Sequence, residues 1–146
     1  MFGVLATLVR RAPVIALFSR GQTRLQPVYV GDVAEAVAQT LDEPLSEGKR
    51  YELGGPDVYT YRELVELVLR RCGSSRVLLP VSFPVWALLA GILSVLPTPP
   101  LTRDQVVLMR RDNVVARDAL TLGDLGVVPS SVEAVLPSIF GSARKD

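Results

Sequence analysis

Four segments of the chain begin with the same polar-to-apolar pattern, which predicts four helix starts. In each, a residue whose side chain can accept a backbone N–H is followed three residues later by Glu or Gln, as in a capping box. After the first start, apolar residues recur at every fourth position. After the second, an apolar stripe ends at Gly73, which is typical of a helix C-terminus. The four pairs are Asp32/Glu35, Thr60/Glu63, Thr102/Gln105 and Ser130/Glu133.

Short runs rich in β-branched and aromatic residues lie between these helices and predict strands. Strands that alternate with helices are typical of α/β proteins with parallel pairing. The predicted strands are short, and the connection from Leu79 to Val114 passes through two helices, so the pattern indicates the second part of a larger sheet. The predicted strands cover 25–30, 51–53, 77–79 and, as an option, 114–115.

The first 31 residues contain four arginines and no acid, a composition shared with organellar targeting peptides. Apolar residues precede the first arginines, so the segment does not have the order of a secretory signal. Pro13 divides it into two short pieces. We favour a surface helix over residues 2–11 and keep a targeting peptide as the alternative.

The 25 residues from 77 to 101 carry no charge, a length that could suggest a membrane span. Prolines leave only the 12 residues 85–96 as uninterrupted helix, about 18 Å at 1.5 Å per residue against a hydrocarbon core of about 30 Å. The segment is therefore too short to cross a bilayer. We favour a buried helix. The alternative is a helix that begins near Val81, carries Trp86, ends near Leu96 and lies at a membrane interface or against a hydrophobic partner.

Composition and charge exclude several classes of function. The chain has 146 residues with 16 Lys+Arg and 15 Asp+Glu, a net charge of +1, which fits one domain or one piece of a larger one and argues against a nucleic-acid partner. The absence of histidine excludes His bases, His-activated nucleophiles and His metal ligands, and we expect no metal. The single Cys72 excludes an internal disulfide and a CxxC redox pair.

The chain lacks the residues with which dinucleotide-binding enzymes hold and use a cofactor. No two glycines stand two apart, so the GxGxxG turn that holds a pyrophosphate is absent. Gly54-Gly55-Pro56 follows a predicted strand, but proline removes a donor there, so we interpret it as a strand-ending turn. No tyrosine is followed by lysine four residues later, the pair that short-chain dehydrogenases use. We assign no catalytic, cofactor-binding or metal residue and expect no tight NAD(P)(H) binding by this chain alone.

Two groups of motifs resemble a known family. The runs QPVYVGDVA at 26–34 and YELGGP at 51–56 resemble the HVxDVA strand–helix–strand near the C-terminal end of extended and atypical short-chain dehydrogenases/reductases. The run LTRDQ at 101–105, with Met109 and Asp112, and LGDLG at 122–126 resemble the branch that contains the nucleotide-binding accessory subunit of respiratory complex I and its bacterial relatives. The resemblance covers the chain from about residue 2 to 139.

The resemblance implies a partial Rossmann-like α/β fold. Residues of about 1–79 would supply the last strands of the parallel sheet and residues of about 80–146 a mainly helical C-terminal lobe, with the glycine fingerprint upstream of Met1. It also implies a cleft near Arg24, Gln26, Tyr29 and Asp32, although Asp32 is explained equally by helix capping. The arginine that contacts substrate phosphate in nucleotide-sugar epimerases is replaced by Leu25, and Arg24, one position away, faces the opposite side of a strand.

The function implied is that of a non-catalytic accessory subunit of the NAD(P)H-binding type that supports assembly or stability of a respiratory NADH dehydrogenase. Full-length relatives would bind NADP(H) or NAD(H), and the partners would be respiratory complex subunits or the missing N-terminal half. The location would be the cytoplasmic side of a bacterial inner membrane or the mitochondrial matrix side. The first alternative is the substrate-binding part of an NAD(P)-dependent reductase or epimerase/dehydratase. The second is a stand-alone hydrophobic interaction module that uses the helix at 84–96.

Overall fold

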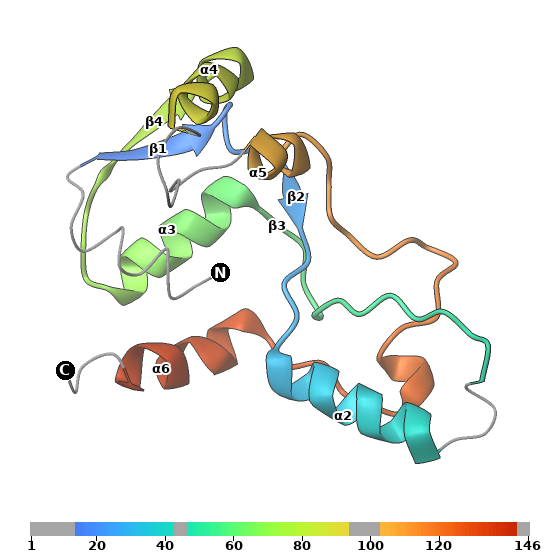
Figure 1. The fold of residues 1–146 in the computed structure, drawn as a ribbon. Helices are drawn as coiled ribbons and strands as arrows, with labels where there is room; N and C mark the ends of the chain where they lie inside the picture. The colour runs from blue at the N-terminus through green and yellow to red at the C-terminus, as the bar shows by residue number, and fades with distance from the viewer. Residues whose placement is uncertain (1–13, 43–46, 94–102, 143–146) are drawn as a thin grey trace. The chain divides into compact units, whose positions relative to one another are not determined.

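The computed structural model describes residues 14–42, 47–93 and 103–142 (Figure 1). The chain divides into two units that interleave in sequence. The first consists of Met1–Leu25 and Tyr59–Asp112, and the second of Gln26–Val58 and Asn113–Asp146. These units do not coincide with the expected division near residue 79, because a strand that spans this position belongs wholly to the first unit.

A parallel strand pair forms the centre of the first unit. Strand β1 (Val14–Phe18) pairs with β4 (Val77–Val81), so the predicted strand at 77–79 and its parallel pairing are confirmed. Ile15 and Leu17 alternate with more exposed neighbours and are buried. Figure 1 shows α3 (Tyr61–Arg71) alongside this pair, and Tyr61 meets Phe18 edge to face. No strand is predicted at β1, because its residues are all apolar and show no alternation.

Helix α3 begins as its sequence predicts. Thr60 Oγ1 accepts the backbone N–H of Glu63 at 3.2 Å, and the Glu63 carboxylate accepts the backbone N–H of Thr60 at 2.7 Å. The N–H and hydroxyl of Thr60 hold the pKa of Glu63 below its usual value. This box therefore stabilises the fold above the unfolded-state pKa of Glu63, and the stabilisation is lost as the pH falls through the folded-state pKa. Two-residue strands β2 (Arg24–Leu25) and β3 (Tyr59–Thr60) pair antiparallel just before this helix.

Two other predicted helix starts are wrong, one by three residues and one by a single residue. Helix α2 (Val30–Asp42) begins before Asp32, which lies in its first turn and is not its N-cap. This helix also begins inside the strand predicted at 25–30, of which only Leu25 lies in a strand. Helix α6 (Val132–Ser142) is capped by Ser131, whose Oγ accepts the Ala134 N–H at 3.3 Å, and not by Ser130. In both cases the side chain predicted to cap its own helix bonds elsewhere.

Two predictions fall at or beyond the limits of the described residues. Helix α5 (Arg103–Leu108) begins where a cap at residue 102 predicts, but Thr102 itself lies outside the described residues. The surface helix predicted over residues 2–11 also lies outside them.

The second unit is built around a small apolar cluster. Ala36 of α2 packs with Leu122 and Val127, beside the 3-10 helix η2 (Gly123–Leu125). The apolar residues predicted at every fourth position of α2 are Val33, Val37 and Leu41, and since Val37 and Leu41 are exposed, this stripe does not face the core. The strand predicted at 51–53 is reduced to a single parallel bridge from Tyr51 to Leu120, and residues 114–115 form no strand.

Helix α4 (Phe83–Leu93) lies within the uncharged segment. It begins two residues earlier than expected, because proline at position 84 falls in the first turn, where a missing N–H costs no helical hydrogen bond. Ala90 is buried, but Val85, Leu88, Leu89 and Ile92 are exposed. The prediction of a buried helix is therefore wrong. Among the described residues, no helix has the length and apolar character needed to cross a membrane.

Candidate functional site

The four residues expected to line a cleft are divided between the two units. Arg24 belongs to the first unit, and Gln26, Tyr29 and Asp32 belong to the second. Arg24 is exposed, and its backbone N–H bonds to Asp112 Oδ1 at 2.8 Å. Nothing in this contact assigns the Arg24 guanidinium to a ligand, so its cleft role stays a prediction.

Gln26 connects two loops of its own unit. Its Nε2 donates to the carbonyl oxygen of Gly55 at 2.8 Å, and its Oε1 accepts the backbone N–H of Val115 at 2.9 Å. The side-chain amide is thus engaged at both its donor and its acceptor end. This arrangement is that of a structural bridge, and it leaves Gln26 limited capacity to hold a ligand.

The glycine pair of the predicted turn is required by close packing. A Cβ at Gly54 would come within 2.7 Å of Gln26 Cδ, and a Cβ at Gly55 would overlap the carbonyl oxygen of Pro27. Neither glycine has a positive φ, so the requirement is for space and not for an unusual backbone conformation. The loop after Tyr51 therefore uses its glycines to admit neighbouring chain, which agrees with its interpretation as a structural turn.

Asp32 makes a long-range contact through a buried carboxylate. It is only 6% exposed, and its Oδ2 accepts the backbone N–H of Ser130 at 2.6 Å. Its Oδ1 accepts the hydroxyl of the same serine at 2.9 Å. The family-motif aspartate thus fastens α2 to the segment before α6. This role of Ser130 could not be predicted from a local pattern, because the two residues are 98 positions apart.

Tyr29 is the most exposed of the three candidates in the second unit. Its ring lies against Gly31, where a Cβ would overlap the ring edge, and its carbonyl oxygen accepts the N–H of Val33 at 3.2 Å in the first turn of α2. Part of the residue is open to solvent. Tyr29 therefore remains available for contact with a ligand or with further protein, and its cleft role stays a prediction.

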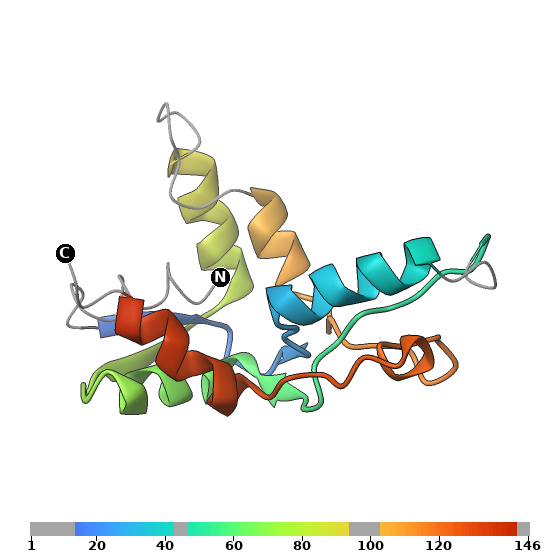
Figure 2. The same ribbon diagram turned by 90° about the horizontal axis from the view of Figure 1, so that it is seen from below.

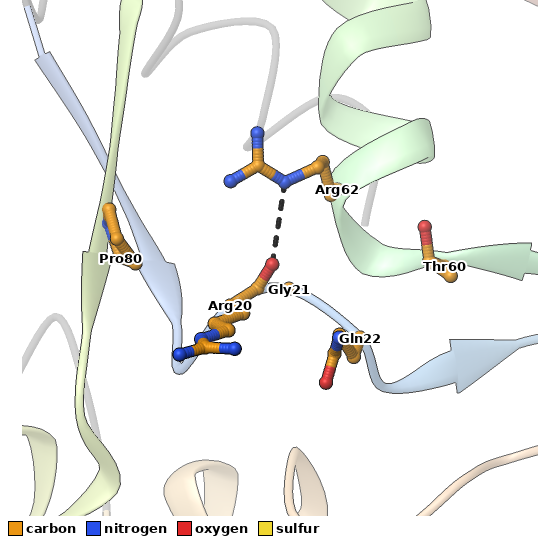
Figure 3. A pocket seen from close by; sticks show the side chains of 6 residues that line it. All are labelled: Arg20, Gly21, Gln22, Thr60, Arg62 and Pro80. Atoms are coloured by element: carbon orange, nitrogen blue, oxygen red, sulfur yellow. Dashed lines mark hydrogen bonds between the residues drawn. The ribbon is translucent and has the colours of Figure 1, made fainter.

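A shallow cavity of about 470 Å³ lies in the first unit, and none of the residues predicted for the cleft lines it (Figure 3). Arg62 donates its Nε–H to the carbonyl oxygen of Arg20 at 3.4 Å and pairs with Glu66 at 3.6 Å. Gly21 permits this approach, because its Cβ would come within 2.9 Å of Arg62 Cβ. One of the two guanidinium groups is thus already partnered. The cavity is lined by Arg20, Gly21, Gln22, Thr60, Arg62 and Pro80.

This cavity does not assemble a reacting set of groups. The hydroxyl that lines the cavity belongs to Thr60. It is part of the α3 capping box, where it donates to the Glu63 carboxylate at 2.9 Å. Its six lining residues include no acid–base pair and no activated nucleophile. In the part of the chain that the structure describes, no group of His, Cys, Asp and Glu is arranged to hold a metal ion.

Comparison with solved structures defines the class of fold. The triphenylmethane reductase of Citrobacter sp. matches 94% of this chain and 47% of its own length with a TM-score of 0.69 and 19% sequence identity. An Escherichia coli NADPH-dependent quinone oxidoreductase, solved with NADPH, matches 95% of this chain and 50% of its own with a TM-score of 0.69 and 18% identity. The chain has part of the α/β fold of NAD(P)-binding reductases, as the sequence predicts.

Sequence comparison finds relatives among the subunits of respiratory NADH dehydrogenases. The mitochondrial NADH dehydrogenase [ubiquinone] 1 alpha subcomplex subunit 9 of Arabidopsis thaliana is 34% identical over 135 residues, 86% of this chain and 34% of that protein. The mitochondrial NADH-ubiquinone oxidoreductase 40 kDa subunit of Neurospora crassa is 31% identical over 90% of this chain and 36% of its own length. No protein-family model matches. The chain is similar to these subunits over most of its own length, and it spans about a third of the length of the curated relatives it matches.

Proposed function

We propose that this chain is part of a non-catalytic, dehydrogenase-like accessory subunit that supports the assembly or stability of a respiratory NADH dehydrogenase. The observation that carries the proposal is the 34% identity to a subunit of that enzyme over 86% of the chain. Partners would be other subunits of the complex or the remainder of the fold. The location would be the matrix side of a mitochondrial membrane, or the cytoplasmic side of a bacterial one.

The roles of the motif residues support a structural task. Gln26 bridges two loops, and Asp32 fastens α2 to the chain before α6. The glycines after Tyr51 admit neighbouring backbone and side chains. The motif residues thus stabilise the second unit. This supports a subunit in which these residues maintain the fold and do not take part in catalysis.

The first prediction concerns the cofactor. NADP(H) or NAD(H) would bind the full-length protein, but the chain alone contains no glycine turn that could present amides to a pyrophosphate. We expect titration of the purified chain with NADPH in a calorimeter to give a dissociation constant above about 100 μM. This corresponds to a binding free energy smaller in magnitude than about 5.5 kcal/mol. A micromolar or tighter constant would show that the chain holds a nucleotide site of its own.

The second prediction concerns the complex. When a tagged form of the natural protein is expressed in its own host, we expect it to comigrate with NADH dehydrogenase activity on native gels. Loss of the gene should lower the amount of assembled complex, and a chain carrying Asp32→Ala should restore less of it than one carrying Asp118→Ala, an exposed aspartate of the same unit. Unchanged assembly after gene loss, with a protein that never comigrates, would contradict the accessory role.

The fold supports one alternative, the substrate-binding part of an NAD(P)-dependent reductase, because the solved structures that match it are of that class. The two proposals differ in what the complete protein does. A reductase would oxidise NADPH with a quinone or dye acceptor in the absence of any other subunit, and an accessory subunit would not.

A further inference from the structure

Helix α4 presents a continuous apolar stripe to solvent. Its exposed residues are Val85, Leu88, Leu89 and Ile92, whose spacing of three, one and three places them on one face of the helix. Leu88 and Ile92 are 65% and 62% exposed. Leucine and isoleucine side chains with this much solvent exposure do not gain the free energy that burial in a core provides.

A second helix with exposed apolar residues packs beside α4. Figure 2 shows α5 side by side with α4, and the two helices are in contact. Ala90 of α4 and Val106 of α5 are buried, whereas Val107 and Leu108 are exposed. We call the exposed residues of the two helices the α4–α5 surface. They are Val85, Leu88, Leu89, Ile92, Val107 and Leu108.

Positive charge gathers at one end of the α4–α5 surface. The Arg110 guanidinium lies 5.4 Å from the centre of the Phe83 ring, at the start of α4, and exposed Arg111 follows it. Arg24 is held nearby, since its backbone N–H bonds to Asp112 at 2.8 Å. Exposed Asp112 accompanies these three arginines and exposed Asp104 lies in the first turn of α5, so the arginines outnumber the acids.

We propose that the α4–α5 surface binds the interface of a bilayer that contains anionic lipids. Helix α4 lies in the plane of the membrane with its stripe at the level of the upper acyl chains, and Arg110 and Arg111 contact headgroup phosphates. An 11-residue helix is about 16 Å long, too short to cross a hydrocarbon core of about 30 Å, so the contact is one-sided. The inference rests on the proposed function, for which it names the surface that faces the membrane.

Two features favour lipid over a protein occupant. The sequence of α4, FPVWALLAGIL, contains no charged, hydroxyl or amide side chain, and the uncharged run continues on both sides from 77 to 101. Its single side-chain donor, Trp86 Nε1, is turned inward to the carbonyl oxygen of Leu17 at 3.2 Å. The stripe therefore offers a partner no side-chain hydrogen bond, while the arginines beside it complement anionic headgroups.

The test is flotation of the purified 146-residue chain with vesicles of phosphatidylcholine alone or with about 30% phosphatidylserine, which gives a strongly negative surface. We expect Leu88→Gln/Ile92→Gln to weaken binding to the anionic vesicles at least about tenfold. The matched control is Leu41→Gln/Val128→Gln in the second unit, where the two residues are 82% and 86% exposed and where binding should be unchanged.

A second pair of variants tests the electrostatic part. Arg110→Gln/Arg111→Gln should weaken binding to anionic vesicles by about fivefold for each arginine and leave binding to neutral vesicles unchanged. The control is Arg70→Gln/Arg71→Gln, an exposed arginine pair at the C-terminal end of α3. If the two double variants weaken vesicle binding equally, binding depends only on the net charge of the chain. That result would overturn the assignment of Arg110 and Arg111 to the lipid-binding surface.

Three other outcomes would overturn the proposal. The first is a wild-type chain that ignores both kinds of vesicle, and the second is an equal loss of binding in the Leu41/Val128 control. The third is a wild-type chain that binds no vesicles but self-associates in sedimentation velocity, with Leu88→Gln/Ile92→Gln abolishing the self-association. The surface would then bind a second copy of the chain. None of these measurements involves the respiratory complex, so comigration on native gels can fail or succeed independently.

Discussion

Replacing Gly55 with alanine is expected to disrupt the second unit severely. The new Cβ would overlap the carbonyl oxygen of Pro27, a backbone atom that no rotamer change can move. The shift would also disturb the carbonyl of Gly55 itself, which accepts the Gln26 amide at 2.8 Å. We expect a loss of about 3 kcal/mol or more in the free energy of unfolding, measured by chemical denaturation.

The control for this prediction is Gly123→Ala in the same unit. A Cβ at Gly123 would meet its nearest neighbour, Thr121 Oγ1, at 3.7 Å, which is ordinary van der Waals contact, and its φ is not positive. Its replacement should change stability by less than about 0.5 kcal/mol. If the two variants are equally stable, the 54–56 turn can accommodate a Cβ at Gly55, and the close-packing argument is wrong.

Replacing Asp32 with alanine is expected to have the second largest effect. Two hydrogen bonds from Ser130 to a buried carboxylate would be lost, and the Ser130 N–H would be left without its acceptor. We expect the free energy of unfolding to fall by about 2–4 kcal/mol, more than the roughly 1 kcal/mol that loss of a helix cap would cause. The measurement is urea denaturation followed by circular dichroism.

The asparagine variant separates hydrogen bonding from charge at this position. An asparagine side chain could accept the Ser130 N–H through its Oδ1 and donate an Nδ2–H to the Ser130 hydroxyl, so Asp32→Asn should cost only about 1 kcal/mol. Asp118→Ala, at an exposed site, should be neutral. If asparagine proves as harmful as alanine, the negative charge is needed for something other than fastening Ser130.

The sequence predicts the elements whose determinants are local. Helix α3 is correct at its N-terminus because Thr60 and Glu63 complete the capping box within four residues. Helix α2 begins three residues before, and helix α6 one residue after, the start that its predicted cap gives, because the side chains of Asp32 and Ser130 bond to each other across 98 positions. A local pattern cannot reveal a choice that depends on such a distant partner.

The strands and the candidate site show the same limit. The strand predicted at 51–53 has suitable β-forming residues, but a strand persists only beside a partner, and the described residues offer it one bridge at Leu120. Gln26 and Asp32 were identified by their motif, yet the motif does not state whether a polar side chain faces a ligand or its own fold. The contacts of Gln26 with Gly55 and Val115 favour the fold.

The interleaved units restrict how this part of the protein can be exchanged during evolution or engineering. The chain passes from one unit to the other after residues 25, 58 and 112, so no single crossover point separates them. A chimera that takes helix α4 from a relative would need residues 1–25 and 59–112 from the same parent. The α4–α5 surface should therefore be inherited together with the β1–β4 pair and α3. The second unit can be replaced only by exchanging both of its segments, 26–58 and 113–146, at the same time.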